Sequence, residues 1–167
     1  MKYSILLAAL AISMMACQSS KEKQQAENVA LVENYIKAVE ALNFEAMGNY
    51  LADNYMGNGP SYGDTIYKAA AISNWKDNVE NLYESIHYNR SKLAPITITE
   101  GDNQGDWVIN WAELEIKYKN NGGKVIIWAV TSYHVENGKI VKSITVYNEA
   151  DALRQLGYQI VPAGTQP

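Results

Sequence analysis

The sequence is poor in the residues that build disulfides, metal sites and nucleic-acid interfaces. It has one cysteine, Cys17, so the chain cannot form an internal disulfide. The two histidines, His87 and His134, lie far apart and have no partner at metal-ligand spacing, so we expect no metal site. Lysine and arginine form no cluster and the net charge is −4, which argues against nucleic-acid binding. No phosphate-loop, dinucleotide or serine-nucleophile motif occurs, so we expect no cofactor.

Apolar residues are plentiful by comparison. Of the 167 residues, 47% are hydrophobic and 19% are charged, a balance that supports one folded domain with a sizeable core. The aromatic residues are strongly biased, with twelve tyrosines and four tryptophans against one phenylalanine. Tyrosine and tryptophan join an apolar ring to a polar tip, which suits a pocket that needs shape and a few hydrogen bonds.

The first sixteen residues differ from the rest of the chain. Lys2 is their only charge, and the apolar run from Ile5 to Ala16 is shorter than the ~20 residues of a membrane-spanning helix. A basic start followed by a short apolar run is typical of a secretory signal peptide, predicted here for residues 1–16. The alternative interpretation is a buried N-terminal helix.

The residues Met14-Met15-Ala16-Cys17 resemble the lipobox of bacterial lipoproteins, although Met14 replaces the usual leucine. The resemblance implies cleavage before Cys17 and lipidation of that residue. We therefore expect a protein of the bacterial cell envelope, lipid-anchored to a membrane and facing the periplasm or the cell surface. If Cys17 is not lipidated, the alternative is a secreted protein. The polar stretch that follows predicts a flexible tether over residues 17–28.

Hydrophobic periodicity predicts the secondary structure of the remaining chain. Helical spacing indicates helices over residues 29–42, 44–51 and 65–82, and the glycine-rich stretch 54–64 is predicted to be a loop. Strands are predicted at 85–93 with a continuation at 96–99, then at 106–119, 125–135 and 140–147. Asn137-Gly138 joins the last two strands as a tight hairpin turn, and a short helix from Glu149 should end at Gly157. Helices followed by a run of strands indicate an α+β fold.

Five residues are candidates for a ligand pocket. Trp75 lies on the apolar face of its predicted helix, and Asn110 lies in register with the apolar residues of its strand. Thr131 and Tyr133 share one strand face, and Tyr147 shares a face with polar neighbours on the next strand. A buried amide must find partners, so Asn110 either joins a polar network or contacts a ligand. The alternative is that all five are core residues with satisfied polar tips.

The order of the elements resembles the nuclear-transport-factor-2-like superfamily, and the C-terminal segment resembles SnoaL-like domains. The matching residues are Tyr133, the turn 137–140 (Asn-Gly-Lys-Ile), Asn148 and the closing segment 153–157 (Leu-Arg-Gln-Leu-Gly). This resemblance implies a cone-shaped roll over residues 29–158. A curved antiparallel sheet of about four to six strands would wrap three N-terminal helices, with a pocket at the open end. A short C-terminal helix and a tail at residues 159–167 would follow.

The resemblance also bears on function. The superfamily includes polyketide cyclases, ketosteroid isomerases and dehydratases with a pocket Asp or His as general base, and many non-catalytic binders. Thr131 and Asn148 stand where these enzymes typically have acids, and neither can act as a carboxylate base. We therefore expect non-catalytic binding of a small apolar ligand or a protein partner. The alternative is a cofactor-independent isomerase, cyclase or lyase with an acid from elsewhere, such as Asp53 or Asp64. A homodimer through the outer sheet face is a further expectation.

The lipid anchor can be tested by one substitution. Cys17→Ser should abolish lipid incorporation and release the protein from membranes, because the acylated sulfur is removed. Metabolic labelling with a fatty acid and detergent phase partitioning measure the two effects. Membrane partitioning that is unchanged in the variant would reject the lipoprotein interpretation.

Overall fold

The computed structural model describes residues 2–162 and 164, with side chains from Ser20 onward. Over these residues it contains four helices and six strands. In chain order they are α1 (Lys2–Glu40), α2 (Phe44–Tyr50), β1 (Leu51–Asn58), β2 (Thr65–Tyr67), α3 (Lys68–Asn81), β3 (Tyr83–Ile98), β4 (Gly105–Tyr118), β5 (Lys124–Glu136), β6 (Lys139–Tyr147) and α4 (Glu149–Gln155). The expected α+β class is confirmed.

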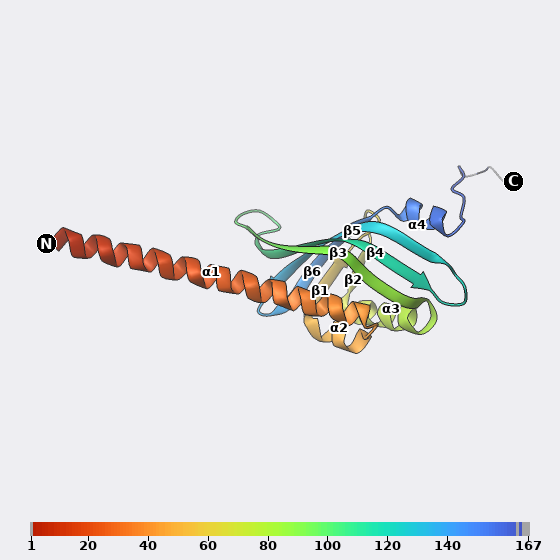
Figure 1. The fold of residues 1–167 in the computed structure, drawn as a ribbon, viewed down its shortest axis with the longest axis horizontal. Helices are drawn as coiled ribbons and strands as arrows, with labels where there is room; N and C mark the ends of the chain where they lie inside the picture. The colour runs from red at the N-terminus through yellow and green to blue at the C-terminus, as the bar shows by residue number, and fades with distance from the viewer. Residues whose placement is uncertain (1, 163, 165–167) are drawn as a thin grey trace.

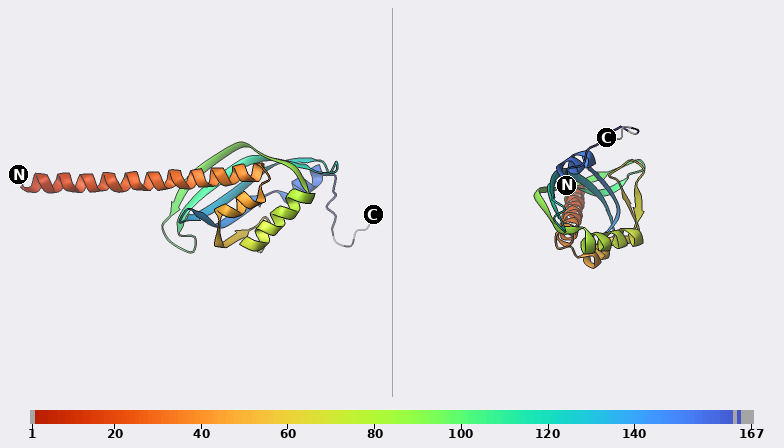
Figure 2. Two further views of the ribbon diagram at one scale, coloured as in Figure 1. Left: turned by 90° about the horizontal axis from the view of Figure 1, so that it is seen from below. Right: turned by 90° about the vertical axis from the view of Figure 1, so that its right-hand side faces the viewer.

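The strands form one open, strongly curved sheet in the order β2-β1-β6-β5-β4-β3. The end of α1, together with α2 and α3, lies on its concave side, while the rest of α1 projects away from the sheet (Figures 1 and 2). Seen from the end opposite the N-terminus, the sheet arches between α3 and α4 (Figure 2). This arrangement is the expected cone, with α3 and α4 at its open end.

The C-terminal hairpin is confirmed. Asn137 and Gly138 have φ values of 50° and 70°, the positive pair that a two-residue hairpin turn requires. The β5–β6 register places Thr131 opposite Thr145 and Tyr133 opposite Ser143. In β5, buried residues alternate strictly with exposed ones from Lys124 to Thr131, so one face of the strand belongs to the interior.

Two strands were not predicted. Residues 51–58 form β1, where a helix end and a loop were expected, and β1 pairs in parallel with β6. The expectation of a purely antiparallel sheet is therefore wrong in this pair, and the sheet is mixed. The β1–β2 hairpin also separates α2 from α3, so the three helices are not consecutive. β1 is short and contains the exposed Asp53 and Asn54, so only its distant partner β6 identifies it as a strand.

α1 is longer than the predicted helix. Residues 17–28, expected to be a flexible tether, are helical. Lysine, glutamate and glutamine favour helix, and α1 has the i,i+4 pairs Lys23–Glu27 (3.9 Å) and Gln24–Asn28 (3.0 Å). Along the described residues, no helix has both the length and the apolar character needed to cross a bilayer. The signal peptide and the lipidation of Cys17 stay predictions, because side chains before Ser20 lie outside the description.

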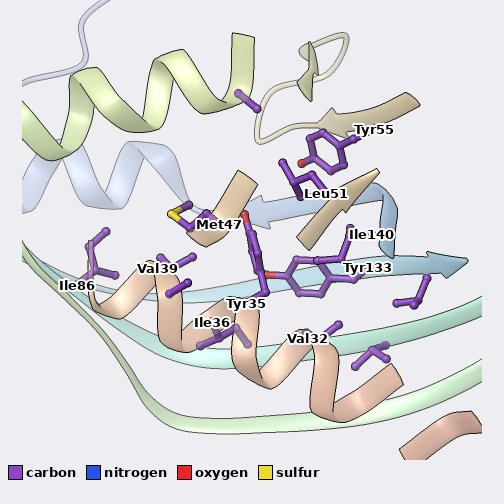
Figure 3. Close-up of a cluster of buried hydrophobic side chains, with 14 of the residues drawn as sticks. Val32, Tyr35, Ile36, Val39, Met47, Leu51, Tyr55, Ile86, Tyr133 and Ile140 are labelled. Carbon is purple, nitrogen blue, oxygen red and sulfur yellow. The ribbon is translucent and has the colours of Figure 1, made fainter. Parts of the chain in front are cut away.

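The core lies between α1 and the concave face of the sheet (Figure 3). Val32 and Val39 on α1 are 0% and 1% exposed. Tyr35 meets Tyr133 of β5 edge-to-face, with ring centroids 5.7 Å apart. α1 therefore fills one half of the cone and ends at Glu40, whose Oε1 accepts a hydrogen bond from the backbone N–H of Tyr88 at 2.8 Å.

The C-terminal helix α4 packs beside the N-terminal part of β5, which extends beyond its pairing with β6. The Gln155 side chain forms two hydrogen bonds with the backbone of Ile126, each 2.9 Å long. Asn148 caps the helix by accepting a hydrogen bond from the Asp151 N–H at 3.0 Å, and Gly157 follows its end with φ 88°. Of the expected tail at residues 159–167, residues 159–162 are irregular, and residues 163 and 165–167 lie outside the described part.

Candidate functional site

A cavity of about 320 Å³ occupies the half of the cone that α1 leaves empty. Its walls come from α1, α3, β1, the four strands β3 to β6, and α4. Ligand pockets usually measure roughly 300–1,000 Å³, so this one suits a small molecule.

All five residues proposed as pocket residues line this cavity. Trp75 comes from α3, Asn110 from β4, Thr131 and Tyr133 from β5, and Tyr147 from β6. Successive side chains of a strand point to opposite faces, and the cavity lies on the inner face of the sheet. The alternation pattern therefore predicted the cavity side correctly for the four strand residues. That any of them contacts a ligand stays a prediction.

Tyrosine dominates the lining more than the sequence suggested. Seven line the cavity, in order Tyr35, Tyr55, Tyr83, Tyr88, Tyr118, Tyr133 and Tyr147. The sequence analysis proposed only the last two. Tyr118 shares a strand face with Asn110, so the same alternation could have added it to the candidate pocket residues. Tyr55 could not be found in this way, because it lies in β1, part of which was predicted to be a loop.

The buried end of the cavity holds a set of mutually paired hydroxyl groups. The Tyr55 hydroxyl lies 2.7 Å from Ser143 Oγ, and Thr131 Oγ1 lies 3.1 Å from Thr145 Oγ1. The first pair joins β1 to β6 and the second joins β5 to β6, so both depend on strand pairing around β6. These groups can donate to and accept from a ligand, but none of them carries charge at neutral pH.

Asn110 is 2% exposed and faces a bulge in the edge strand β3. Its Nδ2 donates to Ser91 Oγ at 2.7 Å and to the Lys92 carbonyl oxygen at 3.1 Å. A carbonyl oxygen can only accept, which fixes Nδ2 on the β3 side of the amide. Oδ1 is then the acceptor end of an amide that lines the cavity.

Burial keeps the lining tyrosines neutral. Loss of hydration raises the pKa of Tyr35 and Tyr133 well above the usual value, and nearby phenols raise it further. Burial, with Tyr118 and Tyr147 close by, raises the pKa of Tyr83 to about 12. None of these phenols can act as a base near pH 7.

Among the described residues that line the cavity, Glu149 of α4 is the one carboxylate, and there is no lysine, arginine or histidine. Glu149 is exposed, and its Oε2 accepts a hydrogen bond from Ser61 Oγ at 3.3 Å, so it lies at the mouth. The acid alternatives lie elsewhere. Asp53 is exposed and pairs with Lys68 at 2.8 Å, which lowers the pKa of Asp53, and Asp64 lies in the exposed loop between β1 and β2.

Neither histidine reaches the cavity. His87 is exposed on β3, and His134 stacks on Trp107 on the outer face of the sheet with ring centroids 4.8 Å apart. Within the part of the chain that the structure describes, no three His, Cys, Asp or Glu side chains gather as metal ligands would.

The sequence matches the family model of the SnoaL-like domain over residues 32–143. The chain belongs to the SnoaL-like domain family. Among proteins of curated function, none matches the sequence. The matched range runs from α1 to β6 and so includes most of the cavity walls.

Solved structures share the fold of this SnoaL-like domain at low sequence identity. A protein of Xanthomonas campestris described as a candidate polyketide cyclase has a TM-score of 0.65 and 16% identity, covering 79% of this chain and 98% of its own. A candidate isomerase of Bacillus subtilis has a TM-score of 0.60 and 15% identity, with coverages of 82% and 97%. An epoxide hydrolase of the LEH-like type from M. tuberculosis has a TM-score of 0.58 and 13% identity, with coverages of 80% and 91%. At this identity the likeness establishes the fold and leaves the activity to the site.

The raised pKa of Tyr83 predicts a loss of stability in alkali. Its folded-state pKa of about 12 exceeds the ordinary tyrosine pKa of about 10, so its contribution to stability is complete below pH 10 and is lost as the pH rises from 10 through 12. Tyr83→Phe should therefore lose less unfolding free energy than the wild type between pH 9 and pH 12.

Denaturant unfolding at several pH values measures this difference, with phenolate absorbance recorded in parallel. The matched control is Tyr62→Phe, because Tyr62 is fully exposed and does not line the cavity. Equal slopes for the wild type and Tyr83→Phe would contradict the prediction.

Proposed function

We propose that this SnoaL-like domain is a lipid-anchored module of the bacterial cell envelope that binds a small, largely apolar ligand without transforming it. The observation that carries the proposal is the chemistry of the cavity. Its interior is lined by aliphatic side chains, aromatic rings, hydroxyl groups and an amide, and the one carboxylate among the described lining residues lies at the solvent-exposed mouth. Such a lining supplies shape and hydrogen bonds but no buried proton acceptor.

The alternative of an isomerase, cyclase or lyase has less support. A general base must lie within about 3 Å of the proton it removes and must have a pKa near the working pH. At the inner end of the cavity, Thr131 is hydrogen-bonded to Thr145. Asn148 is exposed, does not line the cavity and caps α4. Glu149 is the remaining candidate, and turnover that is lost in Glu149→Gln would favour the enzyme alternative.

The long α1 fits an anchored arrangement. An α-helix rises 1.5 Å per residue, so residues 18–27 would hold the domain about 15 Å from an acyl group on Cys17. We place the domain on the periplasmic or outer side of a bacterial membrane, or in the medium if Cys17 carries no lipid. The signal sequence and the residues around Cys17 support this placement.

Ligand binding can be tested by filling the cavity. Ala129 lines the cavity from β5 and is 7% exposed, so Ala129→Leu projects a larger side chain into the space. We expect the full-length wild type to retain a small molecule in native mass spectrometry, or to bind neutral fragments in ligand-observed NMR. The variant should lose this binding by tenfold or more.

The matched control is Val130→Leu, because Val130 is the next residue and lies on the outer face of β5. It should bind as the wild type does. A wild type that carries no ligand and binds no fragment would contradict the proposed function.

We also propose that the outer face of the sheet joins two copies of the chain. Trp111, Val130 and Val146 form a cross-strand row over β4, β5 and β6, and they are 42%, 36% and 52% exposed. Trp128, 58% exposed, lies beside them under the guanidinium of Arg90. Contiguous apolar surface of this kind usually marks an interaction site.

The charges beside this outer-face row favour a second copy as the occupant. Arg90 pairs with Glu113, and Lys124 pairs with Glu115 at 3.5 Å, so four charges on this face are balanced in pairs, while the exposed Lys92 lies beside Trp111 in the β3–β4 register. An apolar row flanked by paired charges is complemented by a surface of the same kind, which a twofold axis provides.

Sedimentation of the full-length protein tests this dimer. Trp128→Glu should shift the protein toward monomer, because each copy would bury a new carboxylate opposite Glu113, which already pairs with Arg90. Tyr62→Glu, on the remote β1–β2 loop, is the control and should leave the mass unchanged. A wild type that sediments as a monomer at high concentration would refute the dimer.

A further inference from the structure

The mouth half of the cavity is walled by four half-buried aromatic rings. They are Trp75 of α3, Tyr83 of β3, Tyr118 of β4 and Tyr147 of β6, and we call them the aromatic cage. Trp75 and Tyr83 have centroids 6.0 Å apart with planes tilted by 54°, and Tyr83 and Tyr118 have centroids 5.7 Å apart at 53°. The rings are tilted toward one another and are not stacked flat. The cage therefore differs from the inner end, where hydroxyl groups pair with each other.

The electrostatic surroundings of the cage are negative. Glu149 and Asp64 both raise the pKa of Tyr147, after the larger effect of its burial, so both carboxylates lie near enough to oppose a charge there. No basic side chain lines the cavity over the described residues. The nearby Lys119 ammonium is held by the carbonyl oxygens of Val79 and Glu80 at 2.7 and 2.8 Å.

Aromatic faces carry negative potential and attract cations that lie over them. An anion would meet ring faces and a carboxylate without a basic partner, so its burial here would be unfavourable. A primary ammonium would need hydrogen-bond acceptors in place of its lost water. A methylated ammonium needs few or none, and its methyl groups present the apolar surface that tilted rings contact well.

We propose that the aromatic cage binds a methylated ammonium group of about the size of trimethylammonium, with Glu149 as its counter-charge. This inference rests on the proposed ligand-binding function and names the ligand class of the same cavity. The remainder of the ligand extends toward the inner end, where Asn110 Oδ1 accepts a hydrogen bond and the Thr131 hydroxyl donates or accepts one. A short alcohol that carries a methylated ammonium group has both the cation and the hydrogen-bonding group.

The test compares a cation with its neutral isostere. Choline and 3,3-dimethylbutan-1-ol have the same shape, but the second has carbon in place of the charged nitrogen. Isothermal titration calorimetry on the full-length protein should show choline binding at least tenfold more tightly. A third arm presents phosphatidylcholine vesicles at the same headgroup concentration, and it tells a free compound from a lipid headgroup as the source of the trimethylammonium group.

Three outcomes are distinguishable. Tighter binding of choline, or of choline-headgroup vesicles, than of the neutral alcohol supports the inference. Equal binding of choline and the alcohol overturns the inference and leaves the ligand-binding function standing. If neither binds, the cation inference is overturned, and the fragment and mass-spectrometric experiments decide separately whether the cavity binds another ligand.

Substitutions at the cage separate the contribution of an aromatic ring to choline binding from the contribution of the Glu149 charge. Tyr147→Phe keeps the ring and should bind choline about tenfold more tightly than Tyr147→Leu, which removes it. Glu149→Gln should weaken choline severalfold and affect the neutral alcohol less. Glu80→Gln removes an exposed carboxylate of α3 that does not line the cavity, and it should change neither affinity.

Far-ultraviolet circular dichroism confirms that each variant is folded before binding is measured. Similar choline affinities for Tyr147→Phe and Tyr147→Leu would overturn the cage. Equal weakening of choline and the neutral alcohol by Glu149→Gln would overturn the role of that carboxylate as a counter-charge.

Discussion

The packing of α1 against the concave face of a curved sheet is the constraint on which the structure depends. Val32, Ile36 and Val39 are almost completely buried, and Tyr35 meets Tyr133 edge-to-face. The helix ends at Glu40, where a hydrogen bond to the Tyr88 N–H ties it to β3. Because the helix ends inside the cone, side chains from the surrounding strands must line the space beyond it. The position of the cavity is therefore set by the length of one helix.

The inner end of that space is lined by paired hydroxyl groups. Strand pairing around β6 brings the hydroxyls of Tyr55, Ser143, Thr131 and Thr145 together, and they satisfy each other at 2.7 and 3.1 Å. Buried groups that are already paired hold their geometry without a ligand, which lowers the ordering cost of binding. The same fold carries different chemistries in other proteins, so the choice of side chains at these positions decides function. Here the side chains at these positions are apolar groups, phenols, aliphatic hydroxyls and an amide, and our proposal of ligand binding rests on them.

The two faces of the sheet have different roles although both carry apolar residues. In β5 the inward residues Val125 and Ile127 belong to the interior, and the outward residues Ile126 and Trp128 are 40% and 58% exposed. A strand that covers a core on one side needs apolar residues on that side only. The second apolar row is therefore not required to cover the core, and this is the reason that we propose an interface there.

The sequence by itself determined the elements whose signals are local. The hairpin 124–147 follows from period-two alternation around Asn137-Gly138, and the helix over 29–42 follows from its apolar spacing, because neighbouring residues specify both. The same alternation placed Asn110, Thr131, Tyr133 and Tyr147 on the cavity side. Only the tertiary structure decided that residues 51–58 are a strand, since their partner β6 lies some ninety residues away and their own composition favours a turn. It also decided which tyrosines share one cavity and left Asp53 and Asp64 outside it, because proximity between distant segments depends on how the whole sheet curves around α1.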